Sequence, residues 1–166
     1  MIFPTEVITI VPFEGKYQKA VEDLVLQIQR SEFGVPVTRE DQPELIDIHG
    51  VFQRGAGNFW VALENGRVVG TVGVVDIFNQ QVALKKMFVA KEFRGKEIGV
   101  GQALLDRALA WCRQKNIKQI LLGSTAPMKA AHRFYEKNGF LPVARKNLPS
   151  NFPIVPVDSK FYRYDL

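Results

Sequence analysis

The spacing of apolar positions changes from strand-like to helical near the start of the chain. A run of β-branched residues over 7–11 predicts a first strand. From residue 17 onward, apolar residues recur at intervals of three and four, which predicts an amphipathic helix that ends near residue 34. Asp41 is followed by Pro at the second position and Glu at the third, so it has the form of an N-cap with a capping box. A short second helix is therefore predicted from Asp41.

The next apolar segments predict an antiparallel meander. They cover residues 59–63, 68–77 and 82–89. The first two are separated by Asn65-Gly66, a strong hairpin signal because both turn positions need a positive φ. Short connections of this kind join antiparallel neighbours.

The second half of the chain alternates helices with strands. Helices are predicted at 99–115 and 128–137, and strands at 117–122, 140–145 and 161–166. Asn138-Gly139 has the composition of a helix C-terminus, and the Pro-rich segment 148–156 is predicted to be an irregular loop. The resulting order, β-α-α-β-β-β-α-β-α-β-β, predicts an α/β fold with a mixed (α+β) sheet and helices on its faces. We expect residues 1–166 to form a single domain.

Composition narrows the classes of protein that remain. The 166 residues are 46% apolar and 23% charged, as in a packed domain, and 22 Lys and Arg against 17 Asp and Glu give a net charge of +5. Cys112 is the single cysteine, which excludes an intramolecular disulfide and a thiolate cluster, and two isolated histidines predict no metal site. The absence of a signal-like or 18-residue apolar stretch predicts a cytoplasmic protein without a membrane span. The charge leaves nucleic acid, an anionic membrane or a phosphorylated small molecule as partners.

A basic, glycine-rich turn between the strand at 82–89 and the helix at 99–115 is the most informative segment. Such a turn directs several backbone N–H groups and the positive end of the helix dipole at one point, while Arg94 and Lys96 add positive charge. This chemistry suits a phosphate or pyrophosphate. The P-loop pattern is absent, and Leu104 stands where a dinucleotide fingerprint needs its third glycine.

Two motifs resemble the GNAT superfamily of N-acetyltransferases. The turn Lys96-Glu97-Ile98-Gly99-Val100-Gly101 is similar to the family's pyrophosphate loop, with Lys where the family has Gln or Arg. Residues 131–140 match the family pattern Ala-x-x-Phe-Tyr-x-x-x-Gly-Phe. The resemblance covers residues 7–166 in element order. It implies a mostly antiparallel sheet whose fourth and fifth strands splay apart to admit the pantetheine arm of acetyl-CoA.

The resemblance also implies roles for particular residues. The cofactor would lie against a strand and turn made of Met87, Phe88, Val89, Arg94, Gly95, Lys96, Glu97, Ile98, Gly99, Val100, Gly101 and Gln102. The backbone N–H of Phe88 is a candidate oxyanion donor. Tyr135 would be the general acid that protonates the departing thiolate, with Phe134 in the core. The carboxylate that some family members carry on the fourth strand is missing here, so the general base stays open between Asp76 and His132, and His132 is expected to be an exposed helix residue.

The resulting prediction is an acetyl-CoA-dependent N-acetyltransferase that acts by direct attack of a primary amine, carried by a small molecule or a peptide. One alternative is a non-catalytic acyl-CoA sensor on the same fold. A nucleic-acid-binding domain is the second, although the sequence has no recognition-helix pattern and its basic residues gather at the turn. The five acids within residues 31–47 suggest a cationic acceptor. A homodimer is expected because dimers are common among relatives.

Overall fold

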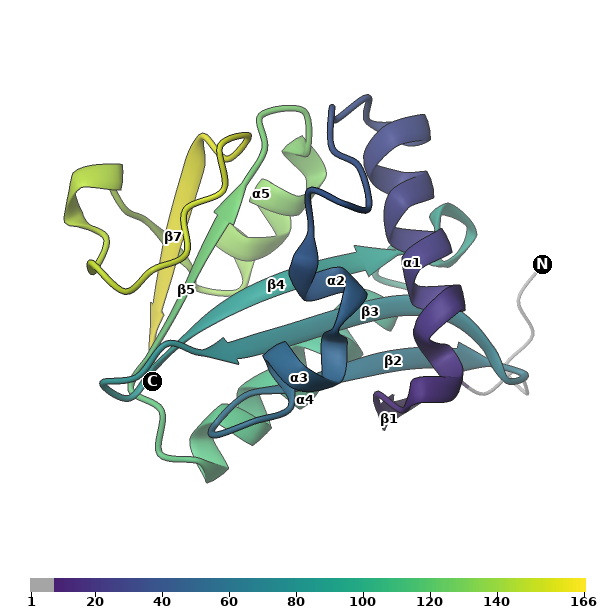
Figure 1. Cartoon of the computed structure of the whole chain (residues 1–166), viewed down its shortest axis with the longest axis horizontal. Helices are drawn as coiled ribbons and strands as arrows, with labels where there is room; N and C mark the ends of the chain where they lie inside the picture. Colours follow the sequence, from purple (N-terminus) through teal and green to yellow (C-terminus); the bar gives the residue numbers. More distant parts are fainter. Residues whose placement is uncertain (1–7) are drawn as a thin grey trace.

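The computed structural model describes residues 8–166, so Val7, the first residue of the predicted opening strand, lies outside the described part. Seven strands form a sheet in the order β1-β2-β3-β4-β5-β7-β6 (Figure 1). The strands are β1 (Ile8–Pro12), β2 (Asn58–Glu64), β3 (Arg67–Asp76), β4 (Gln81–Val89), β5 (Gln119–Ser124), β6 (Leu141–Pro142) and β7 (Lys160–Asp165). All neighbouring strands are antiparallel except β4 and β5, which are parallel. The mixed, mostly antiparallel sheet is therefore confirmed.

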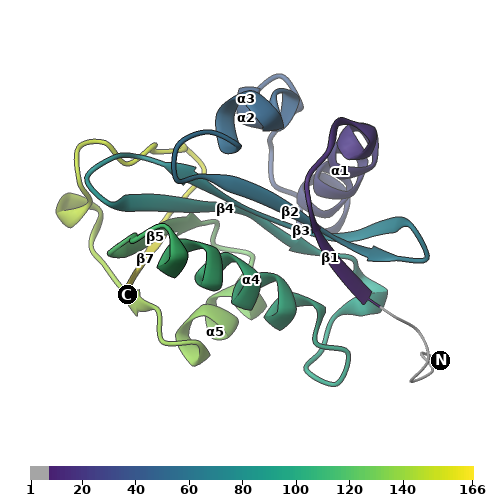
Figure 2. The ribbon, with the colours of Figure 1, turned by 90° about the horizontal axis from the view of Figure 1, so that it is seen from below.

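Helices cover both faces of this sheet. The α-helices are α1 (Gln18–Leu26), α2 (Pro43–Ile46), α3 (Ile48–Phe52), α4 (Val100–Gln114) and α5 (Lys129–Lys137). Figure 2 shows α1, α2 and α3 on one face and α4 and α5 on the other. No helix within residues 8–166 has both the length and the apolar character needed to cross a membrane.

The central strands are apolar on both faces because both faces are covered. Successive strand residues point to opposite sides of a sheet. In β2, Phe59 and Val61 pack with the α1–α3 layer, whereas Trp60 and Ala62 pack with α4. All four side chains are buried. The two helical layers therefore pack against opposite faces of the same strand.

The N-terminal helices differ from their predicted form. The first is α-helical to Leu26 and then continues as a π-helix over Gln27–Glu32, before Gly34 ends it with φ +64°. The predicted capping box is wrong: Gln42 occupies the N-cap of α2, because the Asp41 carboxylate accepts the Thr38 N–H instead.

Turn and strand predictions had mixed outcomes. The Asn65-Gly66 hairpin is confirmed, with φ of +51° and +79°, and Gly139 follows α5 with φ +92°. The predicted strand over 140–145 is wrong beyond Leu141–Pro142, since residues 145–147 form a 3₁₀ turn.

Candidate functional site

The parallel pair β4 and β5 separates part of the way along the sheet. Pairing runs from Gln81 opposite Gln119 to Ala83 opposite Leu121, although β4 continues to Val89 and β5 to Ser124. Figure 1 shows the two strands diverging toward their C-terminal ends. The splay implied by the family resemblance is confirmed, and it leaves one edge of the second half of β4 without a strand partner.

A bulge in β4 lies beside this divergence. Lys86 has φ +57°, and the pairing register with β3 shifts between Thr71 and Gly73. The buried Thr71 hydroxyl donates a hydrogen bond of 2.6 Å to the Lys86 carbonyl and holds the bulge closed. A bulge increases local twist and redirects the residues that follow it. The strand therefore changes direction immediately before Met87.

After the bulge, some backbone N–H and C=O groups of β4 point toward β3, and the others point toward the gap between β4 and β5. The Ala90 N–H donates to the Val69 carbonyl of β3, and the Phe88 carbonyl lies near Gly70 of the same strand. The Val89 carbonyl instead accepts from Arg94, away from β3. Backbone groups alternate between edges along a strand. The predicted oxyanion donor is thus misplaced: Phe88 directs its N–H toward β3, and Val89 presents the free edge.

The first of two cavities, which we name the turn-side cavity, lies between this free edge, the glycine-rich turn and α5. Nine of the twelve predicted cofactor residues line it: Met87, Phe88, Val89, Arg94, Gly95, Lys96, Gly99, Gly101 and Gln102. Gly99 is the N-cap of α4 with φ +74°, a conformation that glycine adopts without strain. At Gly101 an added Cβ would lie 3.8 Å from the side chains of Met87 and Val89, at ordinary van der Waals distance.

The other three predicted residues direct their side chains elsewhere. Val100 is buried in the core, Ile98 packs against that core, and Glu97 is exposed. These residues shape the turn: the Ile98 and Gly99 N–H groups both donate to the Gly95 carbonyl, at 3.2 and 3.0 Å. The predicted set therefore divides into residues that face the cavity and residues that fold the loop around it.

The two basic residues of the turn have different surroundings. Arg94 forms a bidentate pair with Glu32 at the end of the π-helix, with an Nη2 to Oε1 distance of 2.7 Å, and its Nε donates to the Val89 carbonyl at 2.8 Å. The hydrogen bonds from Arg94 lower the pKa of Glu32 below its ordinary value. These contacts hold the Arg94 side chain in place, so the positive charge that it adds to the turn is already paired with Glu32. Lys96 is exposed and makes no ion pair within residues 8–166.

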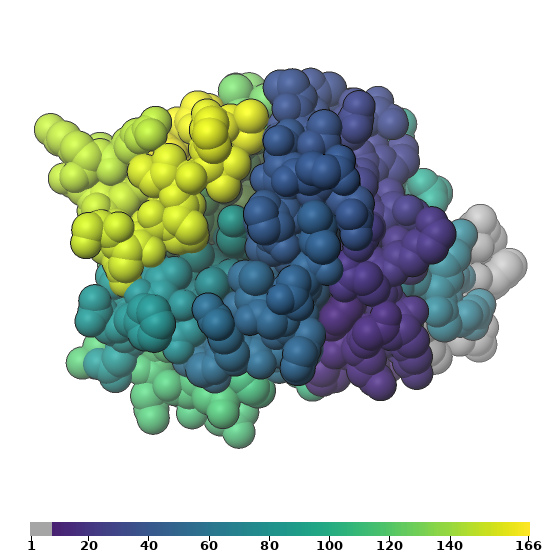
Figure 3. Space-filling model, viewed as in Figure 1, coloured from purple at the N-terminus to yellow at the C-terminus, as the bar shows by residue number. Residues whose placement is uncertain are grey.

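The second cavity, the loop-side cavity, adjoins the first and extends along β4 toward the C-terminal loop. Its walls come from the segment after α1, from β4 and β5, from α5, and from the loop 152–158. Figure 3 shows β4 (teal) at the floor of a hollow between the segment near residue 40 (blue) and the C-terminal loop (yellow). The Pro-rich loop, predicted to be irregular, is thus a wall of a site.

Charged groups of both signs line the loop-side cavity. Glu44 lies 3.0 Å from the Lys86 ammonium and 3.5 Å from that of Lys85. Burial opposes ionisation of Glu44, but the charges of Lys86 and Lys85 outweigh burial and lower its pKa. Burial also lowers the pKa of Lys86, against the attraction of Glu44. Lys86 further donates to Gln42 at 2.5 Å.

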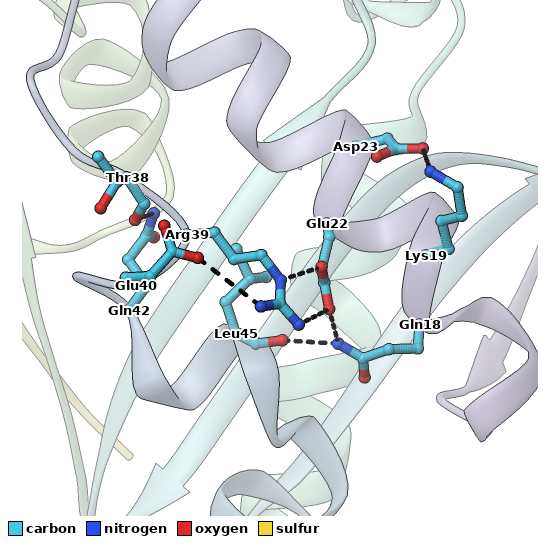
Figure 4. Close-up of polar contacts among 9 residues, drawn as sticks. All are labelled: Gln18, Lys19, Glu22, Asp23, Thr38, Arg39, Glu40, Gln42 and Leu45. Carbon is cyan, nitrogen blue, oxygen red and sulfur yellow. Dashed lines mark hydrogen bonds and ion pairs between the residues drawn. The ribbon is translucent and has the colours of Figure 1, made fainter.

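The wall near residue 40 is fastened to α1. The Arg39 Nε donates to Glu22 at 2.5 Å, and the Gln18 side chain donates to the Leu45 carbonyl at 2.8 Å (Figure 4). The hydrogen bonds that Arg39 donates lower the pKa of Glu22. Short helices of four or five residues have little stability of their own. These contacts therefore hold α2, with Glu44, in its place beside β4.

Tyr135 lines both cavities. Met87, Phe88, Met128 and Ala131 share this property, so the cavities meet where β4 leaves β5. The Tyr135 side chain is 5% exposed, and burial raises the pKa of its phenol well above the ordinary value. Phe134, predicted as core, is half-buried and faces the turn-side cavity.

Both candidates for the general base lie away from the cavities. Asp76 accepts hydrogen bonds from the Ala56 and Phe78 N–H groups and folds a turn. His132 is 8% exposed, not solvent-exposed as predicted, and its Nε2 lies 3.0 Å from the Ser124 hydroxyl. Burial lowers the pKa of His132.

Cys112 is buried in α4, as its position on the apolar face predicts, and burial raises the pKa of its thiol to about 12. A thiol with so high a pKa is a poor nucleophile at neutral pH. Within residues 8–166, no group of three His, Cys, Asp or Glu side chains is placed to share a metal ion.

The acidic segment 31–47 is largely engaged in internal contacts. Glu32 binds Arg94, Glu44 binds two lysines, and the Asp47 carboxylate accepts the Gly50 N–H. Glu44 is the one of the five acids that lines the loop-side cavity. Attraction of a cationic acceptor by this segment as a whole is therefore not supported.

Sequence reasoning missed two residues of the loop-side cavity. Asp158 lies in the loop before β7. Thr125 follows β5, and its buried hydroxyl has no hydrogen-bond partner among the residues that the structure describes. A hydroxyl left in this way can be satisfied by a bound molecule or a buried water. No local pattern marks either residue, because both come to the site through long-range packing.

Comparisons with known proteins agree with this geometry. Residues 23–140 match the family described as Acetyltransferase (GNAT) family. A crystal structure of a GNAT-family acetyltransferase from Staphylococcus aureus Mu50 superposes with a TM-score of 0.92 at 36% identity, over 96% of this chain and 99% of that one. The chain belongs to the GNAT acetyltransferase family.

Two curated relatives have more specific names. Streptothricin acetyltransferase A of Bacillus subtilis (strain 168) is 28% identical over 151 residues, which cover 90% of this chain and 86% of the relative. The N-acetylaspartate synthetase of Danio rerio is 36% identical over 99 residues, or 58% of this chain. The match spans 34% of that synthetase's length, so the likeness is confined to a part of it.

Proposed function

We propose that the chain is an acetyl-CoA-dependent N-acetyltransferase that acetylates a primary amine of a small molecule or a peptide. The observation that carries this proposal is the meeting of two cavities at Tyr135. The turn-side cavity has features suited to a phosphate-bearing ligand, whereas the loop-side cavity combines apolar walls with a few charged groups. Such a pair of cavities suits a group transfer between two substrates.

The turn-side residues fit coenzyme A. Gly101 lines the turn-side cavity without a side chain of its own, and it lies in the first turn of α4, whose N–H groups are free to bind an anion. Lys96 supplies an exposed positive charge for a phosphate. The free edge of β4 around Val89 can receive an extended arm in the manner of an added strand. When bound, acetyl-CoA supplies an activated acyl carbon and a thiolate leaving group.

The residues of this chain then have separable tasks. Tyr135 retains its proton at neutral pH, because burial raises its pKa, and can give that proton to the departing thiolate. The bulge at Lys86 sets the direction of the strand that carries Met87 and Val89. Backbone N–H groups on that strand's free edge are placed to stabilise a developing oxyanion.

The polar lining of the loop-side cavity and the names of the relatives both favour a small-molecule acceptor. N-acetylaspartate synthetase and streptothricin acetyltransferase A are named for small amine-bearing acceptors. Lys85 and Thr125 line the same cavity and could hold polar groups of such an acceptor. A polar acceptor of this kind matches the mixed charges of the cavity better than an extended polycation does.

Turnover of a defined panel of amines tests this proposal. Purified chain is incubated with acetyl-CoA and L-aspartate, streptothricin, spermidine or a short peptide with a free N-terminus, and released thiol is measured. We expect thiol release above the amine-free rate with at least one amine. Coenzyme A binding without any turnover would favour the acyl-CoA sensor. Retention of a DNA duplex that coenzyme A does not displace would favour a nucleic-acid-binding domain.

A homodimer and a cytoplasmic location remain predictions. Light scattering of the purified chain, with and without coenzyme A, tests the first. Microscopy of the tagged chain in its native cell tests the second.

A further inference from the structure

One carboxylate of the loop-side cavity has no role in the contacts described so far. Asp158 lies in the loop between the Pro-rich segment and β7, and it lines the loop-side cavity together with Tyr135. Its backbone N–H donates to the Val155 carbonyl at 3.0 Å, which fixes the loop locally. Its carboxylate makes no ion pair within 4 Å among residues 8–166. Asp158 is half-buried, and a partly desolvated carboxylate without such a partner lowers the stability of the fold.

The position of the Asp158 carboxylate depends on a glycine. Gly123 of β5 lies beneath it, and a Cβ on Gly123 would be 2.5 Å from the carboxylate oxygen Oδ2. Any side chain larger than hydrogen at residue 123 would therefore push the carboxylate away. Since Gly123 also lines the cavity, the close approach places the carboxylate beside the diverging end of β5.

We propose that Asp158 is the general base that accepts a proton from the ammonium group of the acceptor. This inference rests on the proposed acetyltransferase activity. An alkyl ammonium has a pKa of about 10.4 and must lose a proton before its nitrogen can attack. Asp158 and Tyr135 line the loop-side cavity from two different elements, a loop and a helix, and Tyr135 also lines the turn-side cavity, so the cavity proposed for the acceptor holds both a base and an acid.

The step balances as follows. Asp158 takes one proton from the ammonium, and the free amine forms a C–N bond with the acyl carbon as the C–S bond breaks. The departing thiolate takes the proton of Tyr135. The second proton of the attacking nitrogen passes to solvent as the amide forms, and solvent then restores the phenol of Tyr135 and removes the proton from Asp158. The net products are the amide, the thiol and one released proton.

The surroundings of Asp158 suit a base that accepts a proton and then releases it. Burial raises its pKa, whereas the ammonium groups of Lys85 and Lys86 on β4 oppose that rise. Tyr135 of α5 faces it from a third side, and Arg145 and Lys160 lie with it around a groove on the outer face of the loop. A carboxylate with a raised pKa is a better proton acceptor than an ordinary one.

The first experiment compares pH profiles of the unaltered chain and Asp158→Asn, using the fastest of the four amines named above. We expect kcat/KM for the amine to fall by about 10²–10³ at neutral pH. The loss should shrink as the pH approaches the pKa of the amine, because a free amine needs no base. The affinity for coenzyme A, measured by calorimetry, should stay within about twofold. A loss equal at every pH, weaker coenzyme A binding, or a change in kcat/KM below about twofold would overturn the proposal.

Two further variants test whether the position of the carboxylate matters, and not only its presence. Gly123→Ala keeps Asp158 but displaces it, and we expect the same pH-dependent loss at about a tenth of the size. Asp165→Asn is the matched control, since Asp165 lies at the exposed end of β7 and pairs with Arg163. It should leave the profile unchanged. A Gly123→Ala profile identical to that of the unaltered chain would contradict the role.

Thermal stability gives a readout that does not depend on turnover. Because the pKa of Asp158 is raised by folding, its ionisation disfavours the folded state above the unfolded pKa of about 3.9. Asp158→Asn should therefore raise Tm by about 2–4 °C at neutral pH, with the gain vanishing below about pH 4. A lower Tm at neutral pH would mean that the carboxylate serves packing, and would overturn the proposal. If the unaltered chain acetylates no amine, the proposed activity itself is wrong. If Asp158→Asn turns over normally, the activity stands and only the role of Asp158 as the base is excluded.

Discussion

The two cavities that meet beside β4 are built in different ways. The turn-side cavity is shaped mainly by backbone, with Gly99 in a left-handed conformation, Gly101 without a side chain, and the start of α4. The loop-side cavity is shaped by side chains from distant segments, such as Glu44 and Lys86, which form an ion pair at 3.0 Å. A backbone site tolerates little variation in residue type, whereas a side-chain site can change its ligand by substitution. The conserved chemistry of a family fits the first kind of site, and acceptor selection fits the second.

The largest expected effect concerns Tyr135, the residue common to both cavities. Tyr135→Phe removes the hydroxyl but keeps the ring that packs near Phe140 and Tyr162. We expect kcat to fall by about 10²–10⁴, with coenzyme A affinity unchanged. Steady-state kinetics under conditions where chemistry limits the rate measure this loss. Tyr164→Phe, on β7, is the control, and a loss below about twofold in Tyr135→Phe would remove Tyr135 from the role of acid.

Glu44 tests whether the loop-side region depends on side-chain charge. Glu44→Gln leaves Lys86, whose side chain is 7% exposed, without its carboxylate partner. We expect the free energy of unfolding to fall by about 1–3 kcal/mol, as measured by urea denaturation. Glu40→Gln is the matched control, because the Glu40 side chain is 76% exposed, and it should change stability by less than about 0.5 kcal/mol. Equal effects of the two changes would show that the ion pair does not hold this wall.

Gly101 tests the backbone character of the turn-side region. Gly101→Ala adds a methyl group at ordinary van der Waals distance, 3.8 Å, from the Met87 and Val89 side chains, at the wall of the cavity that we propose for the pyrophosphate. We expect coenzyme A affinity to fall by about tenfold or more, roughly 1.4 kcal/mol, while stability stays the same or rises by up to about 1 kcal/mol. Calorimetry and thermal denaturation measure the two quantities. Gly15→Ala, outside the residues that line the cavity, is the control and should leave the coenzyme A affinity unchanged. An unchanged affinity in Gly101→Ala would show that the ligand lies elsewhere.

The smallest expected effect is the pH dependence of the Arg94 and Glu32 pair, which joins the π-helix to the turn. Since folding lowers the pKa of Glu32, the pair stabilises the folded state above the ordinary glutamate pKa of about 4.3, and this stabilisation is lost as the pH falls through the lowered value. Glu32→Gln should lower Tm slightly at neutral pH, and the difference should disappear near pH 3. Glu14→Gln, at an exposed position, is the control. A difference that persists in acid would exclude the ion pair as its cause.

The contrast between the cavities also explains what the sequence could predict. The turn-side cavity was predictable because its determinants are consecutive: a strand, a glycine-rich turn and a helix within residues 87–102. The strands of the meander were predictable for the same reason, through alternation and the Asn65-Gly66 turn. Nine of the twelve predicted residues line the cavity, and the rest fold the turn.

The loop-side cavity could not be predicted because its residues meet only in the folded chain. Asp158 and Glu44 are more than a hundred positions apart, and neither belongs to a local motif. The burial of His132 depends on its contact with Ser124 across the end of β5, which helical periodicity does not reveal. Arg94 was predicted as a free charge because its partner, Glu32, lies 62 positions earlier in the chain.

The divergence of β4 from β5 has a further consequence for how the protein avoids self-association. It creates an unpaired strand edge inside the sheet, and such edges are templates for pairing with strands of other chains. This edge is short, begins at a bulge with φ +57° at Lys86, and carries two consecutive lysines. The residues Met128, Ala131 and Tyr135 of the α5 region lie across the same cavity and limit access to it. A bulge and a covering element protect strand edges from aggregation, so an opening suited to a ligand is at the same time protected from pairing with another protein strand.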